Sequence, residues 1–166
     1  MRSSLSAAGV ATLLCTLASQ AGAQTAGTTR ATHRNDVAIE LLGKAALYSF
    51  EYQRMVTPAM GLGVGLGVLG SGGGGESATA IFIPAGARFY VIPKDGSLFL
   101  TGGAVFASGI LDSGPFSENA SDFYGFGGMG FEYRATGGFL FRGTAYVLFG
   151  NGGYFIWPGI TVGFAF

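Results

Sequence analysis

YFIWPGITVGFAF, residues 154–166, ends the chain and alternates between two faces along its whole length. Counting back from the terminus, one face carries Phe166, Phe164, Val162, Ile160, Pro158, Ile156 and Tyr154, and the other carries Ala165, Gly163, Thr161, Gly159, Trp157 and Phe155. Side chains that point to opposite sides at every second residue indicate a β-strand with two different environments. The segment therefore predicts a C-terminal strand that ends on an aromatic residue.

The same period of two recurs upstream, so eight strands are predicted in all. They cover residues 36–43, 46–55, 59–69, 78–92, 97–108, 121–134, 139–149 and 154–166. In the third of these segments, glycine occupies every second position from Gly61 to Gly67. These glycines lack the strand-then-helix context of a phosphate-binding loop. We expect them to make room for bulky side chains inside a narrow barrel.

The composition favours a lipid-facing barrel over a soluble domain or a helical membrane protein. Of 166 residues, 31 are Gly, 15 are Phe and 7 are Tyr, only 11% are charged, and the mean hydropathy is +0.45. No stretch approaches the run of about 18 apolar residues that a membrane-spanning helix needs. Apolar residues spread over many short segments suit a barrel whose outer wall faces lipid.

The first 23 residues are predicted to be a secretory signal peptide. Arg2 precedes a small and apolar stretch over residues 7–18, and the small-x-small motif AGA follows at residues 21–23. Cleavage there leaves a mature chain that starts at Gln24. Because Cys15 is the only cysteine, the mature chain has no thiol, which excludes disulfides, thiolate metal sites and cysteine nucleophiles.

The predicted connections fall into two classes. Residues 57–58, 93–96 and 135–138 are tight turns, whereas residues 70–77 (GSGGGGES) and 109–120 (GILDSGPFSENA) are predicted to be longer polar loops. Short turns at one end and long loops at the other are typical of outer-membrane barrels, in which the short turns are periplasmic. We therefore predict an all-β fold over residues 36–166, an antiparallel up-and-down transmembrane β-barrel of eight strands. A flexible lead-in over residues 24–35 precedes it.

Three stretches also carry a resemblance to known proteins. They are ELLGKAALYSFEYQR (residues 40–54), IPAGARFYVIP (residues 83–93) and the terminal GFAF. Together they resemble the largely uncharacterised small outer-membrane β-barrel proteins of Gram-negative bacteria. The resemblance implies export through the secretory pathway and insertion in the outer membrane as an eight-stranded barrel, and it carries over no catalytic residue. The terminal strand, with Phe164 and Phe166, resembles the C-terminal signal that the barrel-assembly machinery recognises.

The predicted faces place five charged side chains inside the barrel. These residues are Glu40, Glu51, Arg88, Glu132 and Arg142, and each lies about two to five residues from the periplasmic end of its strand. Such spacing predicts one layer of ion pairs that closes the lumen, because buried charges need partners. Paired carboxylates could also serve acid–base chemistry. However, no nucleophile or histidine accompanies them, since His33 lies in the lead-in. We predict no catalytic, cofactor-binding or metal-binding residues and no enzymatic activity.

Above this charge belt, the interior is predicted to be apolar. The inward candidates are Phe82, Tyr124, Phe126, Tyr146, Phe155 and Trp157. An apolar lumen could hold a lipid or another hydrophobic molecule. Alternatively, these side chains simply fill the space, because an eight-stranded interior is only about as wide as its own side chains.

Three functional hypotheses follow. The first is a non-enzymatic outer-membrane barrel that is structural or interacts through its extracellular loops. The second is a barrel that binds or carries a hydrophobic small molecule in its outer half. The third is a secreted, soluble, lipocalin-like binding barrel, which would need a polar outer face that these strands lack. The expected partners are outer-membrane lipid and, during insertion, the barrel-assembly machinery. With only eight Lys and Arg against nine Asp and Glu once Arg2 is removed, no nucleic-acid partner is expected, and no cofactor is expected either.

Overall fold

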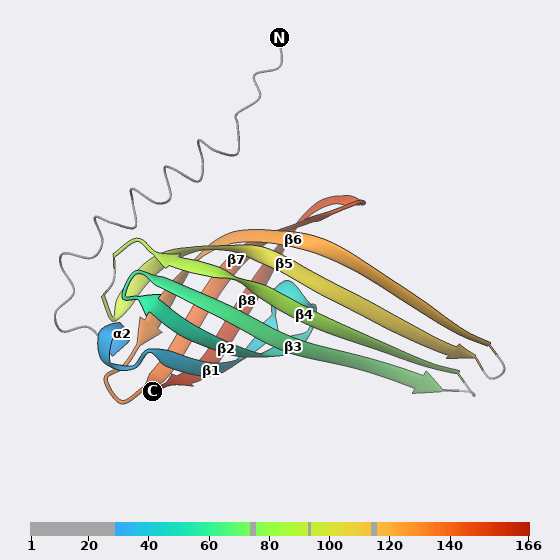
Figure 1. Ribbon diagram of the computed structural model, residues 1–166, viewed down its shortest axis with the longest axis horizontal. Helices are drawn as coiled ribbons and strands as arrows, with labels where there is room; N and C mark the ends of the chain where they lie inside the picture. Colours follow the sequence, from blue (N-terminus) through green and yellow to red (C-terminus); the bar gives the residue numbers. More distant parts are fainter. Residues whose placement is uncertain (1–28, 74–75, 93, 114–115) are drawn as a thin grey trace, which may run out of the picture.

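The computed structural model describes residues 29–73, 76–92, 94–113 and 116–166, and within them the chain forms one closed β-barrel (Figure 1). The strands are β1 (Asn35–Leu42), β2 (Tyr48–Thr57), β3 (Met60–Gly73), β4 (Glu76–Tyr90), β5 (Gly96–Ser113), β6 (Phe116–Arg134), β7 (Phe139–Gly150) and β8 (Gly153–Ala165). Each strand pairs antiparallel with the next, and β8 pairs with β1. This confirms the predicted fold class. The predicted signal peptide lies outside the described residues.

The terminal segment closes the barrel. Residues Asp36 to Leu42 of β1 pair with residues Ala165 to Gly159 of β8. At the very end of this seam, Asn35 and Phe166 exchange two backbone hydrogen bonds of 2.9 and 2.8 Å. Phe164 and Phe166 are exposed on the outer face, and Ala165 between them is buried. From Gly159 to Ala165 the alternation therefore separates the outer wall from the interior, whereas residues 154–156 are exposed whichever side they face.

The barrel has an apolar outer wall and holds charged side chains in its interior, unlike a soluble protein. Outward side chains such as Phe50 and Leu98 are 59% and 60% exposed. Nine charged side chains, in contrast, are buried on the inner side. A water-soluble barrel would need a polar outer face, so this wall fits contact with lipid and does not fit the lipocalin-like hypothesis. No helix in the described part of the chain is long and apolar enough to span a membrane.

The inward glycines of β3 are required by close packing. A side chain at Gly65 would place its Cβ 2.9 Å from the Phe50 carbonyl oxygen and 3.0 Å from Cγ of Pro84. At Gly67, the Cβ would lie 2.8 Å from the Tyr48 carbonyl oxygen. The crowding therefore comes from the neighbouring strands, and it leaves no room for a side chain at these positions.

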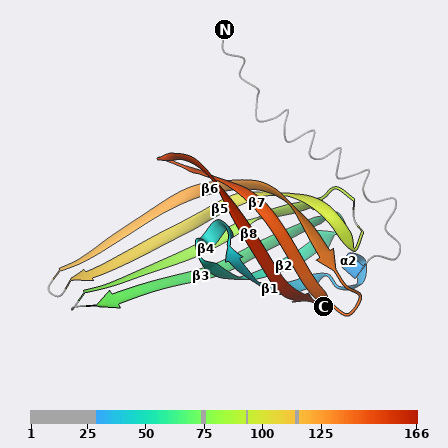
Figure 2. The same ribbon diagram turned by 180° about the vertical axis from the view of Figure 1, so that it is seen from behind.

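Four strands continue well beyond the closed part of the barrel and form a projecting sheet. Figures 1 and 2 show β3, β4, β5 and β6 extending together to one side, away from the shorter β7–β8 hairpin. The ladder continues through Gly73↔Glu76 between β3 and β4 and through Ser113↔Phe116 between β5 and β6. The prediction of polar loops over residues 70–77 and 109–120 was therefore wrong. A backbone ladder does not depend on side-chain hydropathy, so it persists through small and polar residues.

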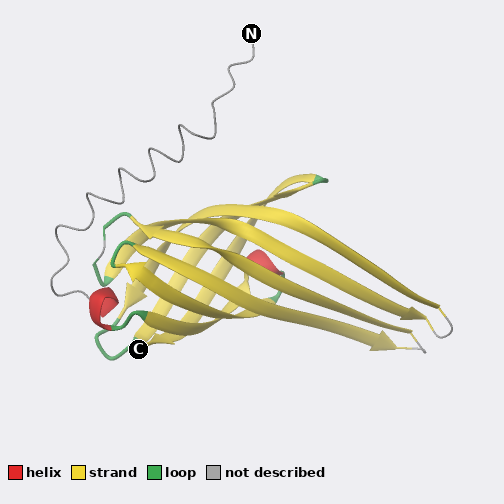
Figure 3. Cartoon of the chain, viewed as in Figure 1, coloured by secondary structure: helices red, strands yellow, loops and turns green. Residues whose placement is uncertain are grey.

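Two short helical segments also belong to the folded structure (Figure 3). Helix α2 (Thr29–Thr32) lies beside the C-terminus at the end of the barrel with the short turns, and the 3₁₀ segment η2 (Gly43–Ala45) connects β1 to β2. Thr29 and Arg30 are buried. The lead-in that we expected to be flexible over residues 24–35 is thus folded from Thr29 onward, because its arginine finds a partner inside the barrel.

Candidate functional site

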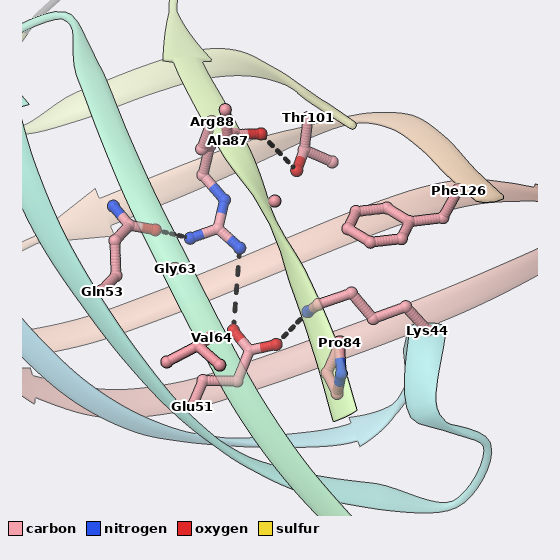
Figure 4. Close-up of a pocket in the computed structure, with 11 residues that line it drawn as sticks. Lys44, Glu51, Gln53, Gly63, Val64, Pro84, Ala87, Arg88, Thr101 and Phe126 are labelled. Carbon is pink, nitrogen blue, oxygen red and sulfur yellow. Dashed lines mark hydrogen bonds and ion pairs between the residues drawn. The ribbon is translucent and has the colours of Figure 1, made fainter. Parts of the chain in front are cut away.

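The first cluster of interior charges lies at the level of η2. The Nζ atom of Lys44 lies 2.9 Å from Oε2 of Glu40 and also contacts Oε1 of Glu51. Glu51 lies 3.7 Å from Nη2 of Arg88, which donates a hydrogen bond to Gln53 (Figure 4). Two acidic and two basic side chains therefore balance one another in this first cluster.

The position of Lys44 depends on an unusual backbone path. Leu42, Gly43 and Ala46 have φ values of 58°, 82° and 67°. These left-handed conformations are costly for residues other than glycine. Through them η2 turns into the barrel, and Lys44 becomes buried. A strained connection thus places a cation between two carboxylates.

The second cluster lies toward the short turns and centres on Glu132. Its Oε1 atom accepts hydrogen bonds of 2.7 and 3.0 Å from Nη2 and Nε of Arg30, and its Oε2 atom accepts one of 2.6 Å from the Tyr90 hydroxyl. Glu132 also pairs with Arg142, its cross-strand neighbour, and lies 3.4 Å from Nε of Arg134. The guanidinium of Arg30 stacks 4.3 Å from the centre of the Tyr90 ring. Glu132 therefore holds three arginines together.

A second carboxylate completes this second cluster. Asp36 pairs with Arg134 at 2.7 Å and with Arg142 at 2.8 Å. Within the described residues, the two clusters together contain five buried basic and four buried acidic side chains. The fifth cation is Arg30, which comes from α2 rather than from the barrel strands. Nη1 of Arg30 and Nη1 of Arg142 are buried without a hydrogen-bond partner, which fits this excess of positive charge.

The structure places all five charged residues of the predicted belt inside the barrel, but it divides them between the two clusters. Four further members were missed. Asp36 and Arg134 share the inward parity of Glu40 and Glu132, so extending the alternation to the strand ends would have found them. Lys44 and Arg30 lie outside the strands, where no alternation signals an inward side chain.

The apolar part of the interior is filled by its own side chains. Val105, Phe126 and Tyr146 form a buried cluster, and Phe82 and Tyr124 pack against it. The Tyr146 hydroxyl donates a hydrogen bond of 2.6 Å to Glu40 and so joins this apolar cluster to the first charge cluster. The last two predicted residues lie nearer the rim, where Phe155 is 53% exposed and its ring centre is 5.1 Å from that of Trp157.

The space left between the charge clusters and the apolar cluster is very small. A cavity of about 20 Å³ lies between Lys44, Glu51, Arg88 and Phe126, which is close to the space that a single water molecule needs. Nearer the rim, a more open cavity of about 330 Å³ is lined by Tyr124, Leu148 and Phe155. The ring of His33, the only histidine, has Nδ1 3.2 Å from the Ala165 carbonyl oxygen, and the His33 backbone carbonyl accepts a hydrogen bond of 2.9 Å from Nη1 of Arg134. Among the described residues, no group of three His, Cys, Asp or Glu is arranged to hold a metal ion.

Comparisons with known proteins agree with this fold. No protein-family model matches the chain, and no curated protein matches it in sequence. Among solved structures, the chain is similar to the N-terminal β-barrel domain of Pseudomonas aeruginosa OprF, with a TM-score of 0.61 and 18% identity over 80% of this chain and 98% of that one. It also matches the Yersinia pestis attachment invasion locus protein Ail, with a TM-score of 0.48 and 14% identity over 80% of this chain and 94% of that one. The protein therefore has the fold of the small eight-stranded outer-membrane β-barrels.

Proposed function

We propose that the protein is a non-enzymatic outer-membrane barrel that acts through the projecting sheet of β3–β6 on the outside of the cell. The observation that carries the proposal is the continuation of these four strands beyond the closed barrel. A barrel that served only as a membrane anchor would not need this extension. The projecting sheet is thus the part of the chain available for contact with other molecules.

A closed lumen supports a role in contact rather than in transport. The two charge clusters and the apolar cluster occupy the interior, and the cavity between them is about 20 Å³. Ion pairs hold the carboxylates of Glu40, Glu51 and Glu132, so none of them is free to act as a general acid or base. This interior serves to hold the barrel in one shape.

The orientation follows from the two ends of the barrel. Helix α2, the C-terminus and the short turns lie at one end, which is the periplasmic end in barrels of this kind. The projecting sheet then lies outside. The signal peptide predicted over residues 1–23 and the aromatic end of β8 fit export followed by insertion in the outer membrane.

Single thiols test this orientation, because the mature chain contains no cysteine. Glu76→Cys lies at the start of β4 in the projecting sheet, and Asp95→Cys lies in a short turn. A membrane-impermeant maleimide on intact cells should label the first variant only, while both should react after lysis. Labelling of only the Asp95→Cys variant on intact cells would show that the orientation is the reverse of the one proposed.

Fractionation tests the location. Intact-mass measurement on washed outer membranes should find a chain that starts at Gln24. Recovery of the protein mainly in the soluble periplasm would contradict the proposal.

A further inference from the structure

The projecting sheet has two free edges. On one side, the pairing of β3 with β2 ends at Phe50↔Leu66, and on the other, the pairing of β6 with β7 begins only at Gly125↔Phe149. Among the described residues, the backbones of residues 68–73 and 116–124 therefore have a strand partner on one side only. A free edge presents unpaired N–H and C=O groups that can bind a further strand.

The two edges differ in how they are protected. Charged side chains and prolines are the common means of preventing unwanted strand pairing at an edge. The β6 edge contains Glu118 and Asp122, and Asp122 pairs with Ala107, a position on the inner face of the sheet. The β3 edge, VLGSGG over residues 68–73, has no charge and no proline, and its register with β4 is uninterrupted. The β3 edge is therefore open to pairing.

Gly70 of the β3 edge is not explained by internal packing. A Cβ atom at Gly70 would lie 4.0 Å from its nearest neighbour, the Ala78 carbonyl oxygen. This spacing is unlike the crowding at Gly65 and Gly67. A strand glycine that nothing crowds leaves its backbone accessible to another backbone.

A groove beside this edge can take alternate side chains of an added strand. It has a volume of about 380 Å³ and is lined by Leu47, Leu69, Ser71, Ala80, Gly109 and Ile110. An added strand points every second side chain to the same face. The edge can therefore supply backbone hydrogen bonds, and the groove can supply side-chain selectivity.

The charge of the projecting sheet indicates the kind of partner. Residues 60–87 and 96–131 contain four acidic residues and no Lys, Arg or His. A positively charged segment is attracted to such a surface. A second copy of this chain is disfavoured, because two projecting sheets would bring like charges together.

We propose that residues 68–73 of β3 bind an extended, positively charged segment of a partner polypeptide by strand addition. The six residues offer an edge of about 20 Å at a rise of about 3.3 Å per residue. The inference rests on the proposed function only in placing this partner outside the cell.

The test uses the full mature protein in detergent micelles and a fluorescent peptide of alternating valine and lysine residues. The matched probe is the same peptide with every backbone nitrogen methylated, so that it keeps its charge but donates no backbone hydrogen bond along either edge. We expect the parent peptide to bind and the methylated peptide to bind at least about tenfold more weakly, because several hydrogen bonds are lost. Amide exchange should slow at residues 68–73.

Two protein variants separate edge pairing from general charge attraction. Leu69, Ala80, Gly109 and Ala120 form one cross-strand row, with Leu69 on the β3 edge and Ala120 on the β6 edge. Leu69→Lys and Ala120→Lys therefore add the same charge in the same row on opposite edges. Leu69→Lys should weaken binding of the parent peptide at least about tenfold, and Ala120→Lys less than about threefold.

Other outcomes would overturn the proposal. If both peptides bind equally, or if both variants weaken binding equally, attraction is by charge alone. If the wild-type protein does not bind the parent peptide, or if a concentration-dependent dimer protects residues 68–73 instead, the β3 edge is not a site for a cationic strand. The methylated peptide keeps the test valid if Leu69→Lys fails to fold. If the peptide binds but the maleimide labels only Asp95→Cys on intact cells, the outward orientation is refuted. The proposed strand-binding site at residues 68–73 is then still supported.

Discussion

Removing the negative charge of Glu132 should destabilise the barrel more than any other single isosteric change in the interior. Glu132→Gln keeps the side-chain shape. Among the described residues, it leaves Arg134 and Arg142 with Asp36 as their carboxylate and leaves Arg30 with none. Two unit charges about 4 Å apart attract by about 4 kcal/mol at an effective dielectric constant of about 20. Desolvation offsets part of this attraction, and breaking a buried pair from one side costs about 3–5 kcal/mol.

The unfolding midpoint in urea measures this loss. With a denaturant slope of about 2 kcal/mol per molar, a loss of about 3–5 kcal/mol lowers the midpoint by about 1.5–2.5 M. Trp157, the only tryptophan, reports unfolding by fluorescence in lipid vesicles. Asp122→Asn is the control, because it removes an exposed carboxylate of the projecting sheet and should change stability by less than about 0.5 kcal/mol.

A second substitution tests the physical reason. Within the part of the chain that the structure describes, Arg30 contacts no carboxylate other than Glu132, so Arg30→Met in the Glu132→Gln background removes the arginine that has lost its partner. The double variant should be more stable than Glu132→Gln alone by about 1–2 kcal/mol. Equal stability of Glu132→Gln and the wild type, or purely additive losses in the double variant, would show that water screens these charges and would refute the argument.

Three further predictions concern the lumen, α2 and the glycines. Reconstituted protein should show no steady stepwise conductance in planar bilayers, because the interior is filled, and reproducible conductance steps would contradict this. Arg30→Met alone should lower the free energy of unfolding by only about 1–2 kcal/mol, because Glu132 still pairs with Arg134 and Arg142. Urea unfolding measures this loss. A loss as large as that of Glu132→Gln would contradict the description of Arg30 as an additional cation on Glu132. Gly65→Ala should lower the free energy of unfolding by about 1–3 kcal/mol through overpacking. Gly70→Ala in the projecting sheet should leave it within about 0.5 kcal/mol of the wild type. Similar thermal midpoints for the two variants would argue against the close approach of neighbouring strands at Gly65.

The parts of the structure that the sequence predicts are those governed by the period of two. Residues 154–165 lie in the expected strand, and Glu40, Glu51 and Glu132 are buried, because one register assigns every side chain of a strand to a face. The lengths of β3–β6 were underestimated because residues 70–77 and 109–120 are small or polar. Their ladders rest on backbone hydrogen bonds, which leave no trace in hydropathy.

The charge clusters depend on segments that carry no periodic signal. Lys44 enters the barrel because the backbone turns inward at Gly43, and Arg30 enters because a short helix folds over the open end. Neither position can be read from alternation. The sequence gives one indication that a further interior cation exists. The predicted belt contains three acidic and two basic side chains, so one carboxylate is left without a partner.

The balance of charge inside the barrel bears on the order in which the protein assembles. Among the residues whose burial is described, the strands and η2 supply four basic and four acidic buried side chains, so the barrel can close around an electrically neutral set of these charges before α2 is in place. Arg30 then docks on Glu132 as an additional cation from the end where the short turns lie. We therefore expect α2 to undock before the strands of the barrel unfold. In a mild denaturant, the amides of residues 29–33 should exchange with solvent well before those of β1.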